Sequence, residues 1–394
     1  RDLVRSRGLG DVYKRQMRLS FEHGTVVISE PPDLDLGFAP GLIWDPRVAL
    51  WRAPARFHSD LVRALRAKKL PLLDSVRPRP SPRMAEWAQL ELRPYQEGAL
   101  LAWTLADRRG LVVLPTGAGK TRVAIAALAE LRLPALVVVP TRALLSQWHA
   151  ELSRVCPEPV GIWGDGERVH GSVTVATFES AYRLMPEHGA RFDVVVVDEV
   201  HHFGLGARDE LLEMSVAKHR LGLTATPPDA AALARLEDLL GPVVYELGLA
   251  DLAGTYLADF DLVELRLPLD ADERLRYQLD HQRFAEVFRG FIRSSPGASW
   301  QDFTSVAMQS AEGRAALAAW RRSRRLLGLT RKKLAAVHEI LERHRCSKLL
   351  IFTADNDAAY AISKRELVMP ITCEIRRKER ARVLSAFREG TIRA

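Results

Sequence analysis

The chain has 394 residues, of which 47% are hydrophobic and 27% are charged, and its net charge is +8 at pH 7. This composition is typical of a globular protein with room for two or three domains. The sequence has no run of 18 apolar residues, which excludes a membrane-spanning helix and a membrane partner. Its three scattered cysteines argue against structural zinc and disulfides, and so favour a cytoplasmic protein. The basic excess favours a polyanionic partner.

Both ends of the chain look atypical. Residues 1–16 lack helical or strand periodicity, and the string from Gly10 to Gln16 resembles translated sequencing adaptor. We therefore interpret residues 1–16 as a non-native scar. The last recognisable element is a helix near 378–388, after which the pattern stops abruptly. We interpret the sequence as a C-terminally truncated fragment.

Residues 17–80 are expected to form a small strand-rich domain. Two short strands flank the turn residues His23 and Gly24, which predicts a hairpin. A helix is predicted at 59–69. Three prolines at 78, 80 and 82 then predict a stiff linker to the next domain.

From about residue 90 the pattern alternates between strand and helix, which predicts a parallel sheet. The strands are nearly all apolar, as a sheet buried on both faces requires. They are predicted at 111–114, 135–139, 173–176, 194–197 and 221–223. Polar residues follow these strands directly, at the edge where open α/β sheets bind ligands. We assign residues 90–247 to this domain.

The remaining residues, 248–394, are expected to form an incomplete second α/β domain. A strand is predicted at 262–267, and Asp270 with Glu273 gives a helix-start signal. Polar helical sequence covers 273–325. Its last five residues form a basic run that suits either a nucleic-acid backbone or a solvated helix face. Helix, strand and helix then follow at 332–344, 349–352 and 358–366.

A glycine-rich loop follows the first strand of the predicted sheet and opens a helix. Its glycines allow backbone N–H groups to close around phosphate oxygens. Lys120 would reach the β- and γ-phosphates of ATP, and the Thr121 hydroxyl would bind Mg²⁺. The predicted ATP-binding residues of the loop are Thr116, Gly117, Ala118, Gly119, Lys120 and Thr121. Leu114 stands at the first position of the loop pattern in place of glycine, which favours a helicase-type loop over that of a kinase or GTPase.

An acidic pair follows four consecutive valines. Asp198 would hold the magnesium, and Glu199 would orient and deprotonate the attacking water. The alternative is an acidic strand end that only faces solvent. Two adjacent histidines do not readily share one metal, so we expect one of them, His201, to couple to the γ-phosphate and His202 to pack.

Further polar residues follow the other strands. Hydroxyl and guanidinium groups suit contacts to nucleic-acid phosphates. The predicted contacts are Pro140, Thr141, Arg142, Thr177 and Phe178. Thr224, Ala225 and Thr226 would couple the nucleotide and nucleic-acid sites. The Gln96 amide suits the adenine edge, or merely marks a helix start. Trp148 is expected in the core.

Together these motifs resemble those of superfamily 2 helicases, in particular the XPB group of archaea and bacteria. The strings that carry the resemblance lie at 92–96, 198–202, 221–227, 251–254 and 350–353. The segment 45–55 resembles the damage-recognition domain of that group. The resemblance implies RecA-like folds for both α/β domains, with 273–325 as a thumb-like insertion. It also implies a nucleoid-associated prokaryotic DNA helicase or translocase with 3′-to-5′ polarity, which acts on single-stranded DNA or a duplex fork in repair or transcription, with a nuclease partner.

The sequence departs from this group in two places. An Arg-Glu-Asp motif used in strand opening is replaced by Pro227-Pro228-Asp229, and the nearest similar string is 235–238. The chain also ends before the arginines that reach the γ-phosphate, so we expect it to bind ATP but to hydrolyse it poorly. The rival interpretations are an RNA helicase, a restriction-system motor subunit and a non-hydrolysing nucleotide-binding scaffold.

Overall fold

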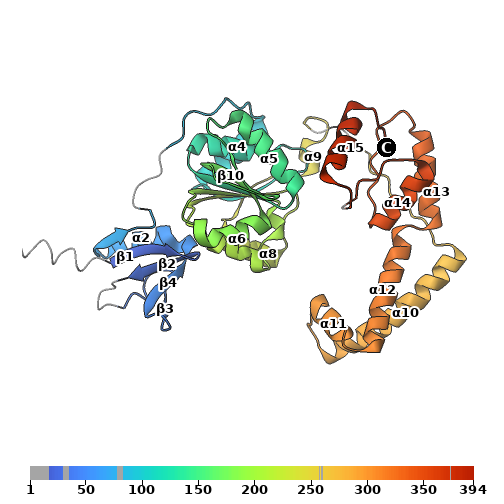
Figure 1. Ribbon diagram of the computed structural model, residues 1–394, viewed down its shortest axis with the longest axis horizontal. Coiled ribbons are helices and arrows are strands. Elements are labelled where there is room, and N and C mark those ends of the chain that lie inside the picture. The colour runs from blue at the N-terminus through green and yellow to red at the C-terminus, as the bar shows by residue number, and fades with distance from the viewer. Residues whose placement is uncertain (1–16, 30–34, 78–82, 257, 259–260, 373) are drawn as a thin grey trace, which may run out of the picture. The chain divides into compact units, whose positions relative to one another are not determined.

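The computed structural model describes residues 17–29, 35–77, 83–256, 258, 261–372 and 374–394. The expected scar and the three linker prolines lie outside these residues. The chain divides into two compact units, 1–260 and 261–394, each of which is described separately (Figure 1). Within the described ranges, no helix has both the length and the apolar character needed to cross a bilayer.

The N-terminal domain is a five-stranded sheet with one helix. Its strands are β1 (Met17–Glu22), β2 (Thr25–Ser29), β3 (Ile43–Asp45), β4 (Leu50–Pro54) and β5 (Leu72–Asp74), in the order β3-β4-β2-β1-β5. The predicted hairpin is confirmed as β1 and β2, and its turn needs Gly24 because φ is +81° there. Helix α2 (His58–Ala67) buries Leu61 and Leu65 and confirms the predicted helix.

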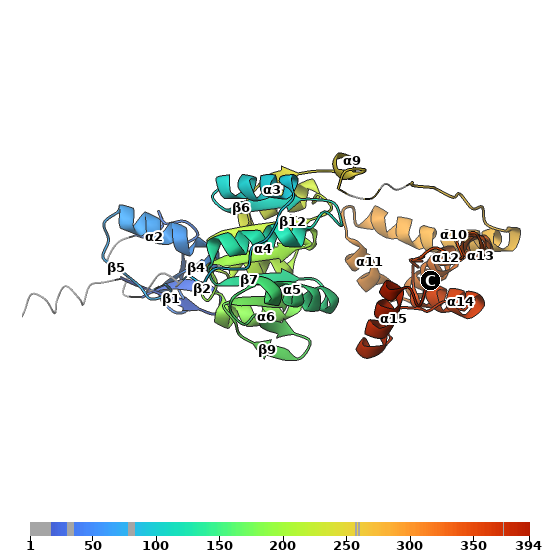
Figure 2. The same cartoon turned by 90° about the horizontal axis from the view of Figure 1, so that it is seen from above.

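The first α/β domain is built on an eight-stranded sheet. In chain order its strands are β6 (Arg109–Val113), β7 (Ala135–Val139), β8 (Gly161–Gly164), β9 (Glu167–Val169), β10 (Val173–Thr177), β11 (Val194–Asp198), β12 (His219–Thr224) and β13 (Val243–Glu246). They lie in the order β13-β6-β12-β11-β7-β10-β8-β9, and all pairs are parallel except β8 with β9. Figure 2 shows β9 at one end of this sheet. The five predicted strands are confirmed to within two residues, whereas β8, β9 and β13 were not predicted.

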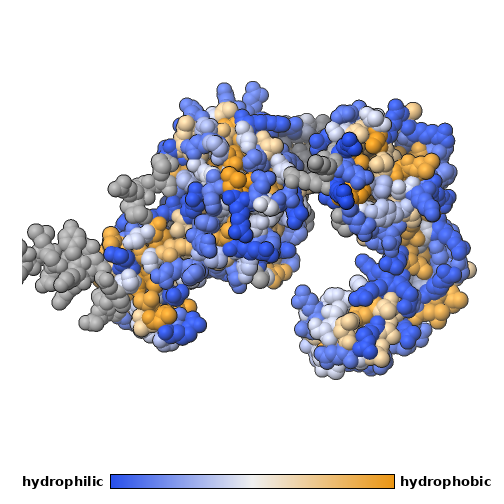
Figure 3. All heavy atoms as spheres, viewed as in Figure 1, coloured by the Kyte–Doolittle hydropathy of each residue, from blue (hydrophilic) through white to orange (hydrophobic). Residues whose placement is uncertain are grey.

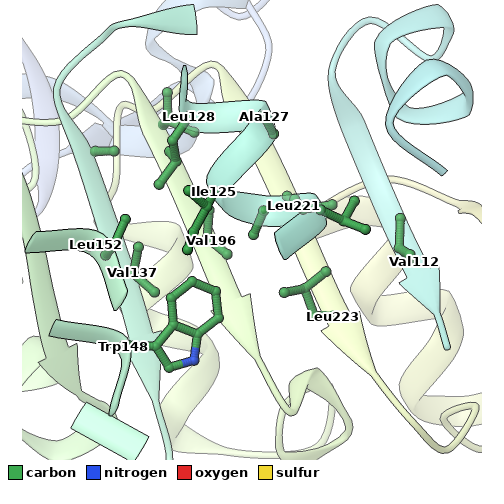
Figure 4. Packing of buried hydrophobic residues seen from close by; sticks show 14 of the residues in the cluster. Val112, Ile125, Ala127, Leu128, Val137, Trp148, Leu152, Val196, Leu221 and Leu223 are labelled. Atoms are coloured by element: carbon green, nitrogen blue, oxygen red, sulfur yellow. The ribbon is translucent and has the colours of Figure 1, made fainter. Parts of the chain in front are cut away.

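Helices cover both faces of this sheet. Those of the domain are α3 (Pro94–Leu105), α4 (Lys120–Leu131), α5 (Arg142–Val155), α6 (Phe178–His188), α7 (Glu210–Glu213) and α8 (Ala230–Leu239). Helix α9 (Leu249–Leu252) lies beyond the predicted boundary at 247 but within the first compact unit. Side chains alternate between the faces of a strand. Val137 and Val196 therefore pack against α4 and α5, whereas their neighbours Val138 and Val197 pack against α6 and α8 (Figure 4). The buried sheet places the end of each strand at one common edge.

The second unit has helices joined by irregular segments, and no strand among its described residues. Its helices are α10 (Ala271–Ser294), α11 (Trp300–Ala307), α12 (Ala311–Gly328), α13 (Arg331–Arg343), α14 (Asn356–Glu366) and α15 (Arg377–Glu389). The helix-start signal is confirmed, because Asp270 and Glu273 form a capping box at α10. Phe284 and Phe288 of α10 pack with Phe303 of α11. In the basic run of α12, Arg322 pairs with Asp280 at 2.5 Å, so one of the positive charges of the run is neutralised inside the unit.

Two predicted strands of the second unit are wrong. Residues 262–267 and 349–352 form no strand, and Leu262 and Phe352 are 90% and 92% exposed. A strand is stabilised by backbone pairing with a neighbour, and no other strand exists among the described residues of this unit to supply it. Figure 3 shows hydrophobic side chains on the surface of this unit. The second unit therefore shows the predicted helices without the predicted sheet.

Candidate nucleotide and nucleic-acid sites

The glycine-rich loop joins β6 to the first residue of α4. Gly117 and Gly119 have φ of +84° and +79°, a region that side chains disfavour. A Cβ atom at Gly119 would lie 2.5 Å from the Gln96 amide nitrogen, so only glycine fits there. A cavity of about 370 Å³ opens at this loop and at the N-terminus of α4. A helix N-terminus with free N–H groups favours anions, so the cavity suits a phosphate chain.

Gln96 holds the glycine-rich loop in place by hydrogen bonds. Its amide nitrogen donates to the Ala118 carbonyl at 2.9 Å, and its amide oxygen accepts from the Arg93 N–H at 2.9 Å. The Tyr95 hydroxyl donates to the same Ala118 carbonyl at 2.7 Å. Gln96 is 2% exposed, and one of its two amide hydrogens and one lone pair of its amide oxygen are used inside the protein. An adenine contact by its remaining groups stays a prediction.

Sequence reasoning missed two cations that line the same cavity. Arg93 donates to the Tyr256 carbonyl at 3.0 Å, and Arg122 donates to the Glu91 carbonyl. The signal for both was available, because Arg93 stands beside Gln96 in one motif and Arg122 directly follows the glycine-rich loop. Both guanidinium groups add positive charge where a nucleotide would bring negative charge.

Lys120 lies between the loop and the acidic pair. Its ammonium donates to the carbonyls of Leu114 and Pro115, at 3.1 and 3.5 Å. Burial lowers the pKa of Lys120, and the carboxylates of Glu199 and Asp198 act in the opposite direction. The loop and the acidic pair therefore meet in one electrostatic environment, as the sequence predicted.

Asp198 ends β11 and is held by two donors. Its Oδ1 accepts from the Glu199 N–H at 3.0 Å, and its Oδ2 accepts from the Trp148 indole N–H at 2.8 Å. Burial raises the pKa of Asp198, whereas the Trp148 hydrogen bond lowers it. Trp148 is fully buried, so its prediction as a core residue is confirmed, but its bond to Asp198 was not foreseen.

The acidic pair is linked to the 224–226 segment through His201. The His201 Nδ1 atom lies 3.4 Å from the Glu199 carboxylate and 3.1 Å from the Thr224 hydroxyl. That hydroxyl donates its one hydrogen to the Thr226 carbonyl at 2.8 Å, so His201 must be the donor in the contact. The His202 ring instead lies beside Phe178, at 6.1 Å between centroids. The two imidazole rings also contact each other, at 4.3 Å between centroids. His202 is exposed and lines the groove described below, so it is not the packing residue that the sequence analysis expected, and the coupling role of His201 stays a prediction.

The residues predicted to contact nucleic acid line one groove of about 800 Å³ at the same sheet edge. Thr141 and Thr177 are the N-caps of α5 and α6, so their hydroxyls already accept backbone N–H groups at 3.2 and 3.3 Å. Phe178 is 6% exposed and packs on Phe203, so its ring offers little surface to a ligand. Exposed arginines that were not predicted complete the lining, and these are Arg168, Arg183 and Arg208.

The string 235–238 is engaged elsewhere. Arg235 of α8 pairs with Glu213 at 2.5 Å and with Asp238 at 2.8 Å. Asp238 and Glu213 also receive Arg56 from the N-terminal domain, at 2.8 and 2.6 Å. The side chains of Arg235 and Asp238 therefore belong to an ion-pair network that holds the N-terminal and α/β domains together. This leaves them little freedom to act on a DNA strand.

Comparison with known proteins agrees with this geometry. Residues 19–76 match the family described as xeroderma pigmentosum group B helicase damage recognition domain, and residues 89–229 match type III restriction enzyme, res subunit. The chain is 34% identical over 367 residues to DNA 3′-5′ translocase XPB2 of Sulfurisphaera tokodaii, which covers 90% of this chain and 81% of that protein.

Shorter matches are found to other proteins. DNA 3′-5′ helicase XPB of Kineococcus radiotolerans is 33% identical over 205 residues, which cover 48% of this chain and 36% of that protein. Among solved structures, the Pyrococcus furiosus Hef helicase domain gives a TM-score of 0.43 at 16% identity, over 76% of this chain and 84% of that one.

The parallel sheet, the glycine-rich loop and the acidic pair define a P-loop NTPase of the superfamily 2 helicase class. The chain belongs to the XPB family within that class, as the match to the Sulfurisphaera protein shows. This membership implies that it uses ATP.

Proposed function

We propose that this chain is an ATP-hydrolysing DNA helicase or translocase with 3′-to-5′ polarity. The observation that carries the proposal is the meeting of three adjacent strand ends. The Val113 end of β6 pairs with Thr224 of β12, and Leu223 of β12 pairs with Asp198 of β11. The phosphate-binding loop, the coupling segment and the acidic pair therefore leave the sheet side by side.

Each of these groups takes a distinct role in the proposed reaction. The loop amides and the Lys120 ammonium hold the triphosphate and stabilise charge that develops on it. Thr121 and Asp198 would hold Mg²⁺, which when bound would neutralise phosphate charge. Glu199 would accept the proton of the attacking water, and it is 28% exposed, so water can reach it. His201 would couple the γ-phosphate to the 224–226 segment through its hydrogen bond to Thr224.

We propose that the groove of Thr141 and Arg142 takes a DNA strand. The support is the arginines that line it, four against three carboxylates, and the helix N-termini of α5 and α6. Arginines and helix N-termini both bind phosphate without reading sequence. The N-terminal domain would add a second DNA contact, residues 248–394 would form a second motor domain, and 273–325 would act as its thumb. A nuclease partner and an association with the nucleoid are part of the same proposal.

ATPase assays with single-stranded DNA, duplex DNA and RNA side by side test the choice of nucleic acid.

Replacing Lys120 with alanine should weaken ATP binding about 10- to 100-fold. The expected loss corresponds to one charge-assisted contact to phosphate, roughly 1.5–3 kcal/mol. Calorimetry with a non-hydrolysable ATP analogue measures it. The exposed Lys218→Ala variant removes the same charge at the opposite edge of the sheet, just before β12, and should bind as the unaltered protein does. Equal affinity of the Lys120→Ala protein would contradict the assignment.

Asp165→Asn should tighten the binding of a single-stranded DNA oligonucleotide about two- to fivefold. Asp165 lies in the β8–β9 turn and pairs with Arg142 at 3.4 Å, so its carboxylate competes with a phosphate for that guanidinium. Asparagine keeps the shape and tolerates the local φ of +53°. Titrations at several salt concentrations should also show that the slope of the logarithm of the binding constant against the logarithm of the salt concentration steepens by up to about 0.7.

The matched control for this variant is Glu167→Gln. Glu167 lines the same groove two residues away, but no ion pair joins it to Arg142. It should change the affinity less than Asp165→Asn does. Equal effects of the two variants would mean that only the overall charge of the groove matters.

A further inference from the structure

Trp148 is a buried tryptophan whose ring packs among apolar side chains but whose indole N–H bonds to a carboxylate. Its ring lies in the apolar cluster with Val137 and Val196, and it has no exposed surface (Figure 4). Yet its indole N–H points to the Oδ2 atom of Asp198 at 2.8 Å. Packing in an apolar cluster uses the hydrocarbon part of the indole, so the N–H is the part of this side chain that needs a separate explanation.

The bond fixes the orientation of a carboxylate that has few other partners. Asp198 is 5% exposed, and its other oxygen accepts the Glu199 N–H. With one donor on each oxygen, the plane of the carboxylate cannot rotate freely, and its remaining lone pairs keep a set direction. Partners of this kind hold metal-binding side chains in place, and their loss typically costs metal affinity 10- to 100-fold.

The same helix also reaches the nucleic-acid groove. Helix α5 begins at Arg142, with Thr141 as its N-cap, and both residues line the groove. Leu145, Trp148 and Leu152 form the buried stripe by which α5 lies on the sheet. A helix is rigid over this length, so a displacement of its first turn is transmitted to the indole. One element therefore carries a phosphate contact at its start and the donor to Asp198 about two turns later.

We propose that Trp148 is a positioning residue that orients Asp198 for magnesium and conveys to it whether the groove holds a nucleic-acid strand. The inference rests on the proposed function, because it takes Asp198 as the metal-binding carboxylate and Arg142 as a DNA contact. It adds to that function a physical connection between the two sites. The connection runs through one hydrogen bond.

The chain contains a matched control for this hydrogen bond. Trp103 of α3 is also fully buried, and its indole N–H donates to the Arg220 carbonyl at 2.9 Å. Trp148→Phe and Trp103→Phe therefore remove the same atoms from equally buried sites. Only the first of them removes a donor from Asp198.

The binding of a fluorescent, non-hydrolysable ATP analogue by the full chain provides the readout. Titration with Mg²⁺ should show that Trp148→Phe needs about 10-fold more magnesium for half-maximal tightening. Affinity for the analogue in EDTA should stay unchanged, and Trp103→Phe should match the unaltered protein in both measurements. An oligonucleotide should lower the half-maximal magnesium concentration of the unaltered protein and of Trp103→Phe, but not that of Trp148→Phe.

Each outcome has a defined meaning. Equal magnesium dependence of Trp148→Phe and Trp103→Phe would overturn the positioning role, and a persistent oligonucleotide effect in Trp148→Phe would overturn the connection to the groove. Absence of magnesium-dependent binding in the unaltered protein would instead overturn the proposed function. If Trp148→Phe does not fold, β-(3-benzothienyl)alanine at position 148 keeps the ring shape, lacks the N–H, and should give the same magnesium shift.

Discussion

Glu199→Gln should lower the rate of ATP hydrolysis about 10²- to 10⁴-fold, the range in which a positioned general base contributes. Glutamine has the same shape but does not accept a proton from water. The backbone of Glu199 has φ of +52°, so the residue directly after β11 is held in a conformation that is uncommon for a residue other than glycine. Single-turnover hydrolysis with protein in excess over ATP measures the effect even where turnover is slow.

ATP binding separates this effect from a general loss of the site. The Glu199→Gln protein should bind ATP with an affinity within about threefold of the unaltered protein, since glutamine removes no phosphate contact. Glu246→Gln is the matched control, because Glu246 is an exposed glutamate at the same end of the sheet, in the edge strand β13. If Glu199→Gln hydrolysed ATP at the rate of this control, another residue would have to be the base.

The parts of this site that were predictable from sequence are those written in one continuous segment. The loop from Thr116 to Thr121 and the pair Asp198–Glu199 are local patterns, and the strands before them are too apolar to lie anywhere but in a buried sheet. Because parallel strands end at one edge, it also followed that these segments would meet. The contact between His201 and Thr224 is a direct result of this arrangement.

The parts that were not predictable depend on partners distant in sequence. The bond from Trp148 to Asp198 joins residues 50 positions apart, and it arises because the strand that precedes α5, β7, lies beside β11. The β8–β9 hairpin is short and contains Gly164 and Gly166, and it exists because β8 pairs with β10. Conversely, the apolar segments at 262–267 and 349–352 read as strands, yet the described residues of that unit contain no strand to pair with them, and a single backbone bond joins Leu349 to Arg393. Local pattern alone does not reveal whether a pairing partner is available.

The contacts of Arg220 also depend on partners distant in sequence, and replacing this residue should have the largest effect on stability. Its guanidinium is fully buried and donates to four backbone carbonyls, with no carboxylate in contact. Two of the acceptors, Leu212 and Leu239, lie in the last turns of α7 and α8, where the partial negative charge of a helix C-terminus favours a cation. Burial lowers the pKa of Arg220 to about 9, so the side chain stays charged at neutral pH.

Arg220→Met should therefore destabilise the protein by about 3–5 kcal/mol, the usual result of removing one partner from a buried polar network. Methionine fills much of the volume but takes the guanidinium donors away from four buried carbonyls. Those of Leu212 and Leu239 keep another donor, whereas those of Ser215 and Ala217 lose the donor that Arg220 supplies. Urea unfolding followed by circular dichroism measures the change, with the exposed Arg154→Met variant of α5 expected within about 0.5 kcal/mol of the unaltered protein. A loss below about 1 kcal/mol in Arg220→Met would mean that water or a local shift satisfies those carbonyls. In that case the arginine would be dispensable for joining the C-terminal ends of α7 and α8 to β12.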